Sequence, residues 1–168
     1  MTTPQVLWKA DAIRSRERTF AQRLNPDSLF AGTGLSRLAG MQRAHVSLAR
    51  IAPGNDSFAY HAHMLEEEWV YILSGHGVAE IDGIEHDVGP GDFMGFATPS
   101  VAHLLKNRSR EELVYLMGGE DQPLDVIEYP HLGKRYLLVG TPEGTEFYEL
   151  GDPIKPFGLA GPDANQES

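Results

Sequence analysis

The stretch that decides the fold is GNDSFAYHAHMLEEEWVYILSG, residues 54–75. In a β-strand, residues two apart point to the same face, so His61 and His63 can present their imidazole nitrogens to one point. Glu68 lies five residues beyond His63, which is the opposite parity for an unbroken strand. It can join the histidines only if the chain turns at about residues 64–66 and a new strand begins there.

The strand expected after this turn has two apolar faces, and its glutamate is the candidate partner of the histidines. Glu68 shares one face with Val70 and Ile72, while Trp69, Tyr71 and Leu73 occupy the other. Two apolar faces are typical of a strand buried between layers or at a subunit interface. Among the three consecutive glutamates, strand parity and the spacing to Gly75 favour Glu68, with Glu67 as the fallback. We expect Glu66 and Glu67 to be turn residues in solvent.

A second segment, GDFMGFATPSVAHLLKN at residues 91–107, supplies another histidine, His103, after a Gly-Asp turn and Pro99. Together the two segments resemble the cupin superfamily. Its first motif reads Gly, five residues, His-x-His, three or four residues, Glu, six residues, Gly, and residues 54–75 fit it with six residues after the first glycine. The end of its second motif is matched by His103 and Asn107. Pro99 is followed by Ser100-Val101-Ala102, so this motif lacks its usual glycine and is one residue short.

The resemblance covers about residues 40–120 and implies an all-β fold, the cupin jelly-roll β-barrel, in small single-domain bacterial cupins without a characterised function. It also implies one divalent metal held by His61, His63, Glu68 and His103. Three imidazoles and one carboxylate suit Fe, Mn, Ni, Zn or Cu and disfavour Ca or Mg, which prefer oxygen ligands. In a six-coordinate ion, two positions stay open for water, a small-molecule substrate or dioxygen.

Several functions fit such a site. The favoured one is a mononuclear metal-dependent enzyme of the dioxygenase type, acting on a small organic molecule. Thiol dioxygenases of this superfamily are disfavoured because they generally lack the glutamate. The alternatives are a redox-neutral isomerase, decarboxylase or lyase, and a non-catalytic small-molecule binding protein or sensor.

The rest of the chain also favours β-structure. Strands are expected at about 42–51, 57–63, 68–74, 77–82, 84–88, 93–97, 102–106, 112–118, 124–129, 136–140 and 145–150. An Asp82-Gly83 turn predicts one hairpin, and residues 142–144 predict a second. We expect one helix between Asp11 and Arg23 and a loosely held tail over residues 151–168. The expected division is an N-terminal extension (1–40), the barrel (41–130), and a C-terminal hairpin and tail (131–168).

Composition excludes several classes of function. The 168 residues carry a formal charge of −10 and form no Lys/Arg cluster, which argues against nucleic acids and anionic membranes as partners. The absence of cysteine excludes disulfides, thiolate metal sites and a cysteine nucleophile. No run is long enough for a membrane helix and no secretory signal is visible, so we expect a cytoplasmic protein. The resemblance and the two-sided strand favour a homodimer, to which the first forty residues could contribute by reaching across to the partner.

The remaining histidines and aromatic residues are better interpreted as structural. For His45 a role in the pocket is the less favoured alternative. His76, His86 and His131 lie by turns and are expected at the surface. Five apolar side chains could line a pocket but more often build a core or an interface: Tyr60, Trp69, Tyr71, Met94 and Phe96. Asn107 is expected to order the turn after its strand.

Overall fold

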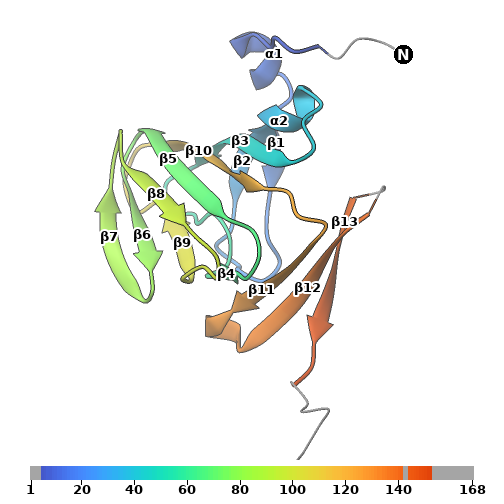
Figure 1. Cartoon of the computed structure of the whole chain (residues 1–168). Coiled ribbons are helices and arrows are strands. Elements are labelled where there is room, and N and C mark those ends of the chain that lie inside the picture. The colour runs from blue at the N-terminus through green and yellow to red at the C-terminus, as the bar shows by residue number, and fades with distance from the viewer. Residues whose placement is uncertain (1–4, 142–143, 153–168) are drawn as a thin grey trace, which may run out of the picture.

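The structure is a computed structural model that describes residues 5–141 and 144–152. Almost all of its regular elements are strands (Figure 1). In chain order they are α1 (Ala10–Arg14), β1 (Arg18–Phe20), β2 (Phe30–Gly34), α2 (Leu35–Leu38), β3 (Ala44–Ile51), β4 (Ala62–His63), β5 (Glu68–Ser74), β6 (Gly77–Ile81), β7 (Ile84–Val88), β8 (Phe93–Phe96), β9 (His103–Lys106), β10 (Leu113–Glu120), β11 (Leu124–Tyr129), the 3₁₀ turn η1 (Pro130–Leu132), β12 (Lys134–Thr141) and β13 (Gly144–Leu150).

The strands form three antiparallel sheets. The largest has the order β1-β2-β3-β10-β5-β8, the second β7-β6-β9, and the third, at the lower right of Figure 1, β13-β12-β11-β4. The first two sheets face each other across the main core, to which Ile51 and Ile72 contribute from one side and Ala79 and Leu105 from the other. This arrangement is a jelly-roll β-barrel, so the expected fold class is confirmed.

The alternation expected in the strand after the glutamates is confirmed. Ile72 on β5 is fully buried in the barrel, while its neighbours Tyr71 and Leu73 on the outer face are 39% and 42% exposed. Glu68, the first residue of β5, therefore points toward the interior like Ile72, because residues of the same parity share a face.

Both expected hairpins form. Ile81 pairs with Ile84 across Asp82 and Gly83, whose φ angles of 50° and 75° are those of a type I′ turn. β12 and β13 pair from Arg135 with Leu150 to Thr141 with Gly144, and residues 142–143 at the tip lie outside the described residues. The tail expected from residue 151 also lies outside them from residue 153 onward.

The helix expected between Asp11 and Arg23 is confirmed only as far as Arg14, where α1 ends, and residues 18–20 form the strand β1 instead. β1 pairs with β2, with Phe20 opposite Phe30, and the two rings stack with centroids 5.3 Å apart. β1 is an exposed edge strand, so its polar composition resembles that of a surface helix. This pairing adds two strands from the first forty residues to the largest sheet.

The strand expected over 57–63 is confirmed only at its end, in β4. Before it, side chains of the N-terminal segment take up backbone groups that a strand would pair. Asn25 donates to the carbonyl of Phe58 at 2.8 Å, and the Ala59 amide donates to Gln22. No helix formed by the described residues is both long and apolar enough to cross a membrane.

Candidate metal centre

Backbone pairing positions the three histidines of the candidate site. His61 forms a single antiparallel bridge with His103, and His63 pairs with Ile127 of β11. Ser100 braces His63 from the loop after Pro99: its amide donates to the His63 carbonyl at 2.8 Å, and its hydroxyl accepts from the His63 amide at 2.7 Å. Ser100, in the loop where the motif lacks its usual glycine, thus fixes the backbone of a site histidine.

Each of the three imidazoles uses Nδ1 to contact an acceptor and directs Nε2 toward Glu68. Nδ1 of His61 lies 2.8 Å from the carbonyl of Ala59, and Nδ1 of His103 lies 3.1 Å from that of Val101. Nδ1 of His63 lies 2.5 Å from Oδ2 of Asp125. Carbonyl and carboxylate oxygens only accept, so Nδ1 must carry the proton in each ring, and in a neutral imidazole Nε2 is then a lone-pair acceptor.

The three histidines named by the resemblance approach the same carboxylate oxygen of Glu68. Oε2 of Glu68 lies 3.1 Å from Nε2 of His103, 3.4 Å from that of His63 and 3.7 Å from that of His61. Two ligands about 2.1 Å from one ion and at right angles to each other are about 3 Å apart. Four acceptor atoms at such distances repel one another unless protons or a cation lie between them. The donor set and its spacing therefore fit a divalent transition metal.

Burial and mutual contacts shift the pKa values of three groups in this cluster. Burial raises the pKa of Glu68, but its interactions with His103, His61 and His63 outweigh this and hold that pKa well below its usual range. Burial lowers the pKa of His61, and the opposing effect of Glu68 does not cancel this. Burial also acts to lower the pKa of His63, but Asp125 and Glu68 raise it above its usual value. Glu68 is therefore an anion at neutral pH, and His61 is neutral.

Aromatic side chains enclose the cluster. Phe96 stacks on His103 with ring centroids 3.7 Å apart and an interplanar angle of 5°, and Phe58 meets His61 edge to face at 5.9 Å. Tyr115, fully buried on β10, has a hydroxyl without a hydrogen-bond partner among the described residues. The three histidines are buried, whereas the side chain of Glu68 is 23% exposed, so solvent reaches the cluster beside Glu68.

The expectation that Glu66 lies in solvent is wrong. It is 7% exposed, because its Oε1 accepts the amide of Gln122 at 2.7 Å and its Oε2 lies 3.9 Å from Nδ1 of His63. Glu67 is exposed, as expected for a turn residue, and lies outside the groups of possible ligands found among the described residues. Those groups are His61, His63 and Glu68, and also His63, Glu66 and Asp125. His103 lies outside both groups, and its Nε2 approaches the first through Glu68, at 3.1 Å.

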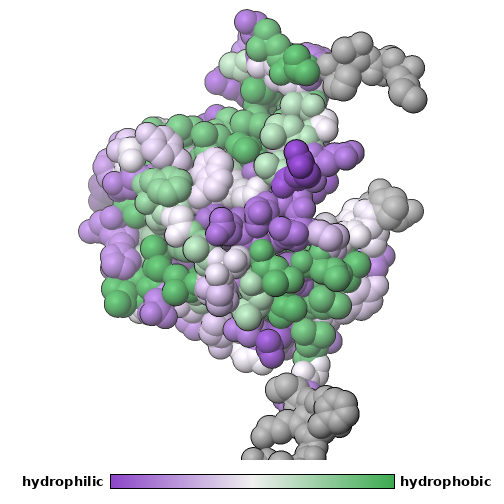
Figure 2. Space-filling model, in the orientation of Figure 1, coloured by the Kyte–Doolittle hydropathy of each residue, from purple (hydrophilic) through white to green (hydrophobic). Residues whose placement is uncertain are grey.

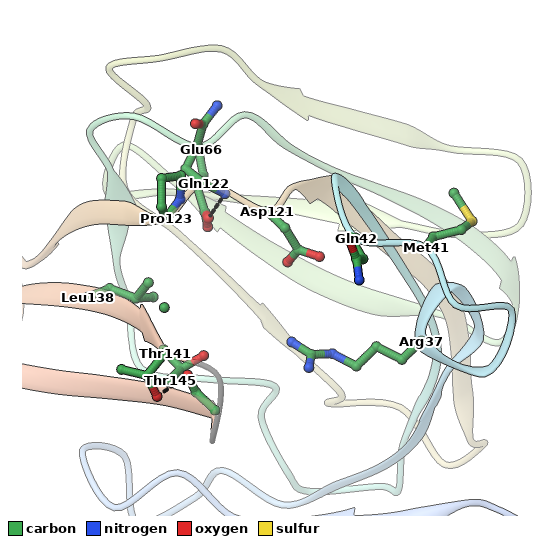
Figure 3. Close-up of a pocket in the computed structure, with 12 residues that line it drawn as sticks. Arg37, Met41, Gln42, Glu66, Asp121, Gln122, Pro123, Leu138, Thr141 and Thr145 are labelled. Carbon is green, nitrogen blue, oxygen red and sulfur yellow. Dashed lines mark hydrogen bonds between the residues drawn. The ribbon is translucent and has the colours of Figure 1, made fainter. Parts of the chain in front are cut away.

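Glu66 also borders a cavity of about 620 Å³ between the segment around α2 and the C-terminal hairpin (Figure 3). Arg37 extends its guanidinium into this cavity, toward Asp121 on one side and Thr141 and Thr145 on the other. Figure 2 shows hydrophilic side chains gathered beside this hollow, above the largely hydrophobic surface of the C-terminal sheet. The cavity is thus polar, and Glu66 links it to the rear of His63.

The other histidines considered from sequence lie outside the groups of possible ligands found among the described residues. His45 is tied to the end of β10, with Nδ1 3.2 Å from the carbonyl of Glu120. The histidines expected at the surface are exposed: His76, His86 and His131. Tyr60 is buried and stacks on His131, Met94 packs against the core, and Trp69 and Tyr71 belong to the outer face of β5.

Asn107 orders its turn as expected. It is fully buried, and its amide donates to the carbonyls of Ile51 and Glu111, each at 2.7 Å. Its Oδ1 accepts from the amide and hydroxyl of Ser109 at 3.0 and 2.9 Å.

The fold and this cluster define a jelly-roll barrel with a candidate metal centre. A cupin-domain family model matches residues 47–119. A candidate sugar phosphate isomerase from Acidithiobacillus ferrooxidans is 31% identical, with a TM-score of 0.80 over 89% of this chain and 96% of that one. The chain belongs to the cupin superfamily.

Two further solved structures are similar. A sugar phosphate isomerase from a cupin superfamily, from Silicibacter pomeroyi, is 26% identical, with a TM-score of 0.74 over 88% of this chain and 96% of that one. A predicted oxalate decarboxylase from Thermotoga maritima is 18% identical, with a TM-score of 0.59 over 69% of this chain and 99% of that one, and this likeness shows the fold alone. No curated protein matches the sequence.

Proposed function

We propose that this protein is a metal-dependent cupin enzyme that catalyses a redox-neutral isomerisation of a small phosphorylated sugar. Metal binding is supported by one observation above all: three Nε2 atoms lie within 3.1–3.7 Å of Oε2 of Glu68. His61, His63, Glu68 and His103 would hold the ion. The reaction class is supported by two relatives, both matched over 96% of their length: a candidate sugar phosphate isomerase at 31% identity and a sugar phosphate isomerase at 26% identity.

The ligand set suits such chemistry. Three neutral imidazoles and one carboxylate leave a divalent ion with a net positive charge, and when bound it would supply a Lewis acid that polarises a carbonyl oxygen. The protein's own contribution is to hold the rings still: Phe96 stacks on His103, and every Nδ1 is tied to an acceptor. Tyr115 adds a buried hydroxyl free to donate a hydrogen bond.

The polar cavity beside Glu66 lies behind His63, on its Nδ1 side, and contains groups that suit a phosphate. Arg37 supplies a guanidinium, whose fork of N–H donors matches phosphate oxygens, and the hydroxyls of Thr141 and Thr145 lie on the opposite wall (Figure 3). Asp121 shares the cavity, and Nδ1 of His45 lies 3.7 Å from its carboxylate. We expect Arg37→Gln to raise KM for a phosphorylated sugar with a smaller effect on kcat.

The metal is tested first by elemental analysis of protein purified without chelator. We expect about one Fe, Mn, Ni or Zn per chain, and its loss in the His61→Ala/His63→Ala double variant. His86→Ala is the matched control, because it removes an exposed histidine on β7 and leaves the cluster intact. Absence of metal from the wild-type protein even after reconstitution would overturn the proposal and leave a ligand-binding barrel.

The reaction is tested by proton NMR of aldose and ketose phosphates in D₂O, with an oxygen electrode run in parallel. We expect interconversion without oxygen consumption, loss of activity in Glu68→Gln, and recovery when metal is restored to the stripped wild-type protein. Oxygen consumption coupled to substrate oxidation would instead support the dioxygenase that the sequence favoured. Binding without turnover, seen as a thermal shift, would support a sensor.

A further inference from the structure

Asp125 is a completely buried carboxylate directly behind His63. Its Oδ2 lies 2.5 Å from Nδ1 of His63, and its Oδ1 accepts the backbone amides of Leu65 and Val126, each at 2.8 Å. Two amides thus fix the orientation of the carboxylate, so that the other oxygen can face only the imidazole.

The C-terminal sheet puts Asp125 in this place. β11 pairs with β4, with Ile127 opposite His63 and Glu128 opposite Ala62, and the Met64 amide donates to the carbonyl of Val126 at 3.0 Å. Asp125 lies beyond residues 47–119, the part matched as a cupin domain. Its contact with the site is therefore made by the part of this chain that follows the matched domain.

We propose that Asp125 is a positioning residue that holds His63 in the tautomer able to bind a metal. By accepting a hydrogen bond from Nδ1–H, it leaves the lone pair on Nε2, which faces Glu68 at 3.4 Å. A carboxylate behind a metal-binding histidine also makes the imidazole a stronger donor. The other two imidazoles have only backbone carbonyls behind them, so His63 becomes the strongest of the three nitrogen donors.

A second metal ion between His63, Glu66 and Asp125 fits the geometry less well. The 2.5 Å between Nδ1 of His63 and Oδ2 of Asp125 is a hydrogen-bond distance, shorter than the roughly 3 Å between ligands at right angles on one ion. The remaining oxygen of Asp125 and one oxygen of Glu66 are already occupied by backbone amides. The three groups are therefore better described as a hydrogen-bonded support behind His63.

The test is the tautomer of His63 in metal-free protein, read from its nitrogen chemical shifts at alkaline pH, where the ring is neutral. We expect the Nδ1–H form in the wild-type protein. In Asp125→Asn the single amide oxygen satisfies Leu65 and Val126, so the NH₂ group faces His63 and we expect the Nε2–H form. Asp92→Asn, which changes an exposed aspartate in a turn, should leave the Nδ1–H form unchanged.

Metal affinity supplies the second readout. We expect Asp125→Asn to bind Zn²⁺ or Mn²⁺ about 10- to 100-fold more weakly than the wild-type protein, as outer-shell substitutions usually do. An Nε2–H form in the wild-type protein would overturn the inference even if the variant failed to fold. So would a folded Asp125→Asn protein with unchanged tautomer and affinity.

The inference rests on the proposed metal centre, but the two can fail separately. A wild-type protein that binds no metal removes the centre, while the tautomer still reports whether Asp125 orients His63. If Asp125→Asn binds one metal ion per chain with wild-type affinity, the proposed metal centre stands and the proposed role of Asp125 is refuted.

Discussion

The backbones of His61 and His103 exchange two hydrogen bonds: the His61 amide donates to the His103 carbonyl at 3.1 Å, and the His103 amide donates back at 2.8 Å. Residues paired in this way point their side chains to the same side, and the two ring centroids are 4.7 Å apart. Two sequence motifs are thereby joined through the backbone at the candidate metal centre, so neither histidine can move without displacing the other.

Removing the metal is expected to lower the thermal stability of the protein. A ligand that binds only the folded state stabilises it by about 4 kcal/mol at a thousandfold excess over Kd. For a chain of this size, that corresponds to a fall in Tm of roughly 8–16 °C when chelator is added. The His61→Ala/His63→Ala variant should show no such fall in calorimetry. An equal fall in both proteins would mean that the chelator acts elsewhere.

Asn107→Ala is expected to destabilise the barrel without affecting metal content. The substitution leaves the buried carbonyl of Ile51 and the amide of Ser109 without their partner, at a cost of about 3 kcal/mol in the free energy of unfolding. Urea denaturation measures this cost. Asn55→Ala is the control, since the Asn55 amide makes only exposed hydrogen bonds of 3.3 Å to Ala52 and Pro53. Similar losses for both variants would contradict the role assigned to Asn107.

Gly75 and Gly83 offer a matched pair that separates backbone strain from steric clash. Their φ angles are 77° and 75°. A Cβ at Gly83 meets nothing within 4 Å, so Gly83→Ala should cost only about 1–2 kcal/mol of strain. A Cβ at Gly75 would lie 2.2 Å from the carbonyl oxygen of Glu112, so Gly75→Ala should be far more destabilising. Equal midpoints in urea would refute the close approach between Gly75 and Glu112.

The stabilisation from Lys106 is expected to disappear at alkaline pH. Its Nζ lies 2.7 Å from both Glu80 and Glu85. Burial acts to lower the Lys106 pKa, but the two carboxylates outweigh it and raise that pKa above 10.5. A raised folded-state pKa gives stability that is full below the unfolded value and is lost as pH rises through the folded one.

Lys106→Gln should therefore lower the free energy of unfolding by roughly 1–2 kcal/mol at pH 7–9, between the values for surface and buried pairs. The difference from the wild-type protein should shrink above about pH 10.5. Lys134→Gln, which breaks a fully exposed pair with Glu149, should have a smaller effect, because solvent screens exposed pairs. A Lys106→Gln difference that persists at pH 11.5 would show that packing of the side chain, not its charge, is what matters.

The sequence predicts those parts of the fold that local chemistry decides. Alternation from Glu68 to Ser74 predicts the bounds of β5, and Asp82-Gly83 predicts its hairpin, because both depend on neighbouring residues. The convergence of His61, His63, Glu68 and His103 was also anticipated, through the strand parity of the first two and the resemblance of both motifs.

Contacts between distant segments could not be predicted in this way. Asp125 lies 62 residues from His63, and only the pairing of β11 with β4 brings them together. Glu66 has the composition of a turn residue and is buried because the amide of Gln122 satisfies it. β1 has no apolar alternation of its own, and its pairing depends on the match between Phe20 and Phe30.

A row of apolar side chains on the outer face of the largest sheet supports the expected homodimer. Leu48, Leu116, Tyr71 and Phe93 lie in register on the adjacent strands β3, β10, β5 and β8, and Phe93 is 63% exposed. An exposed, continuous apolar row on a sheet is typical of a protein interface.

We expect light scattering at micromolar concentration to give twice the chain mass of 18.5 kDa. Phe93→Glu should shift the equilibrium toward the single chain, because it places a charge in the row that the partner would desolvate. Ile84→Glu changes a residue of similar exposure, 61%, on β7 outside the row and should leave the mass unchanged. A wild-type mass of one chain would remove the homodimer. A dimer that survives Phe93→Glu but not Ile84→Glu would place the interface on the sheet that contains β7.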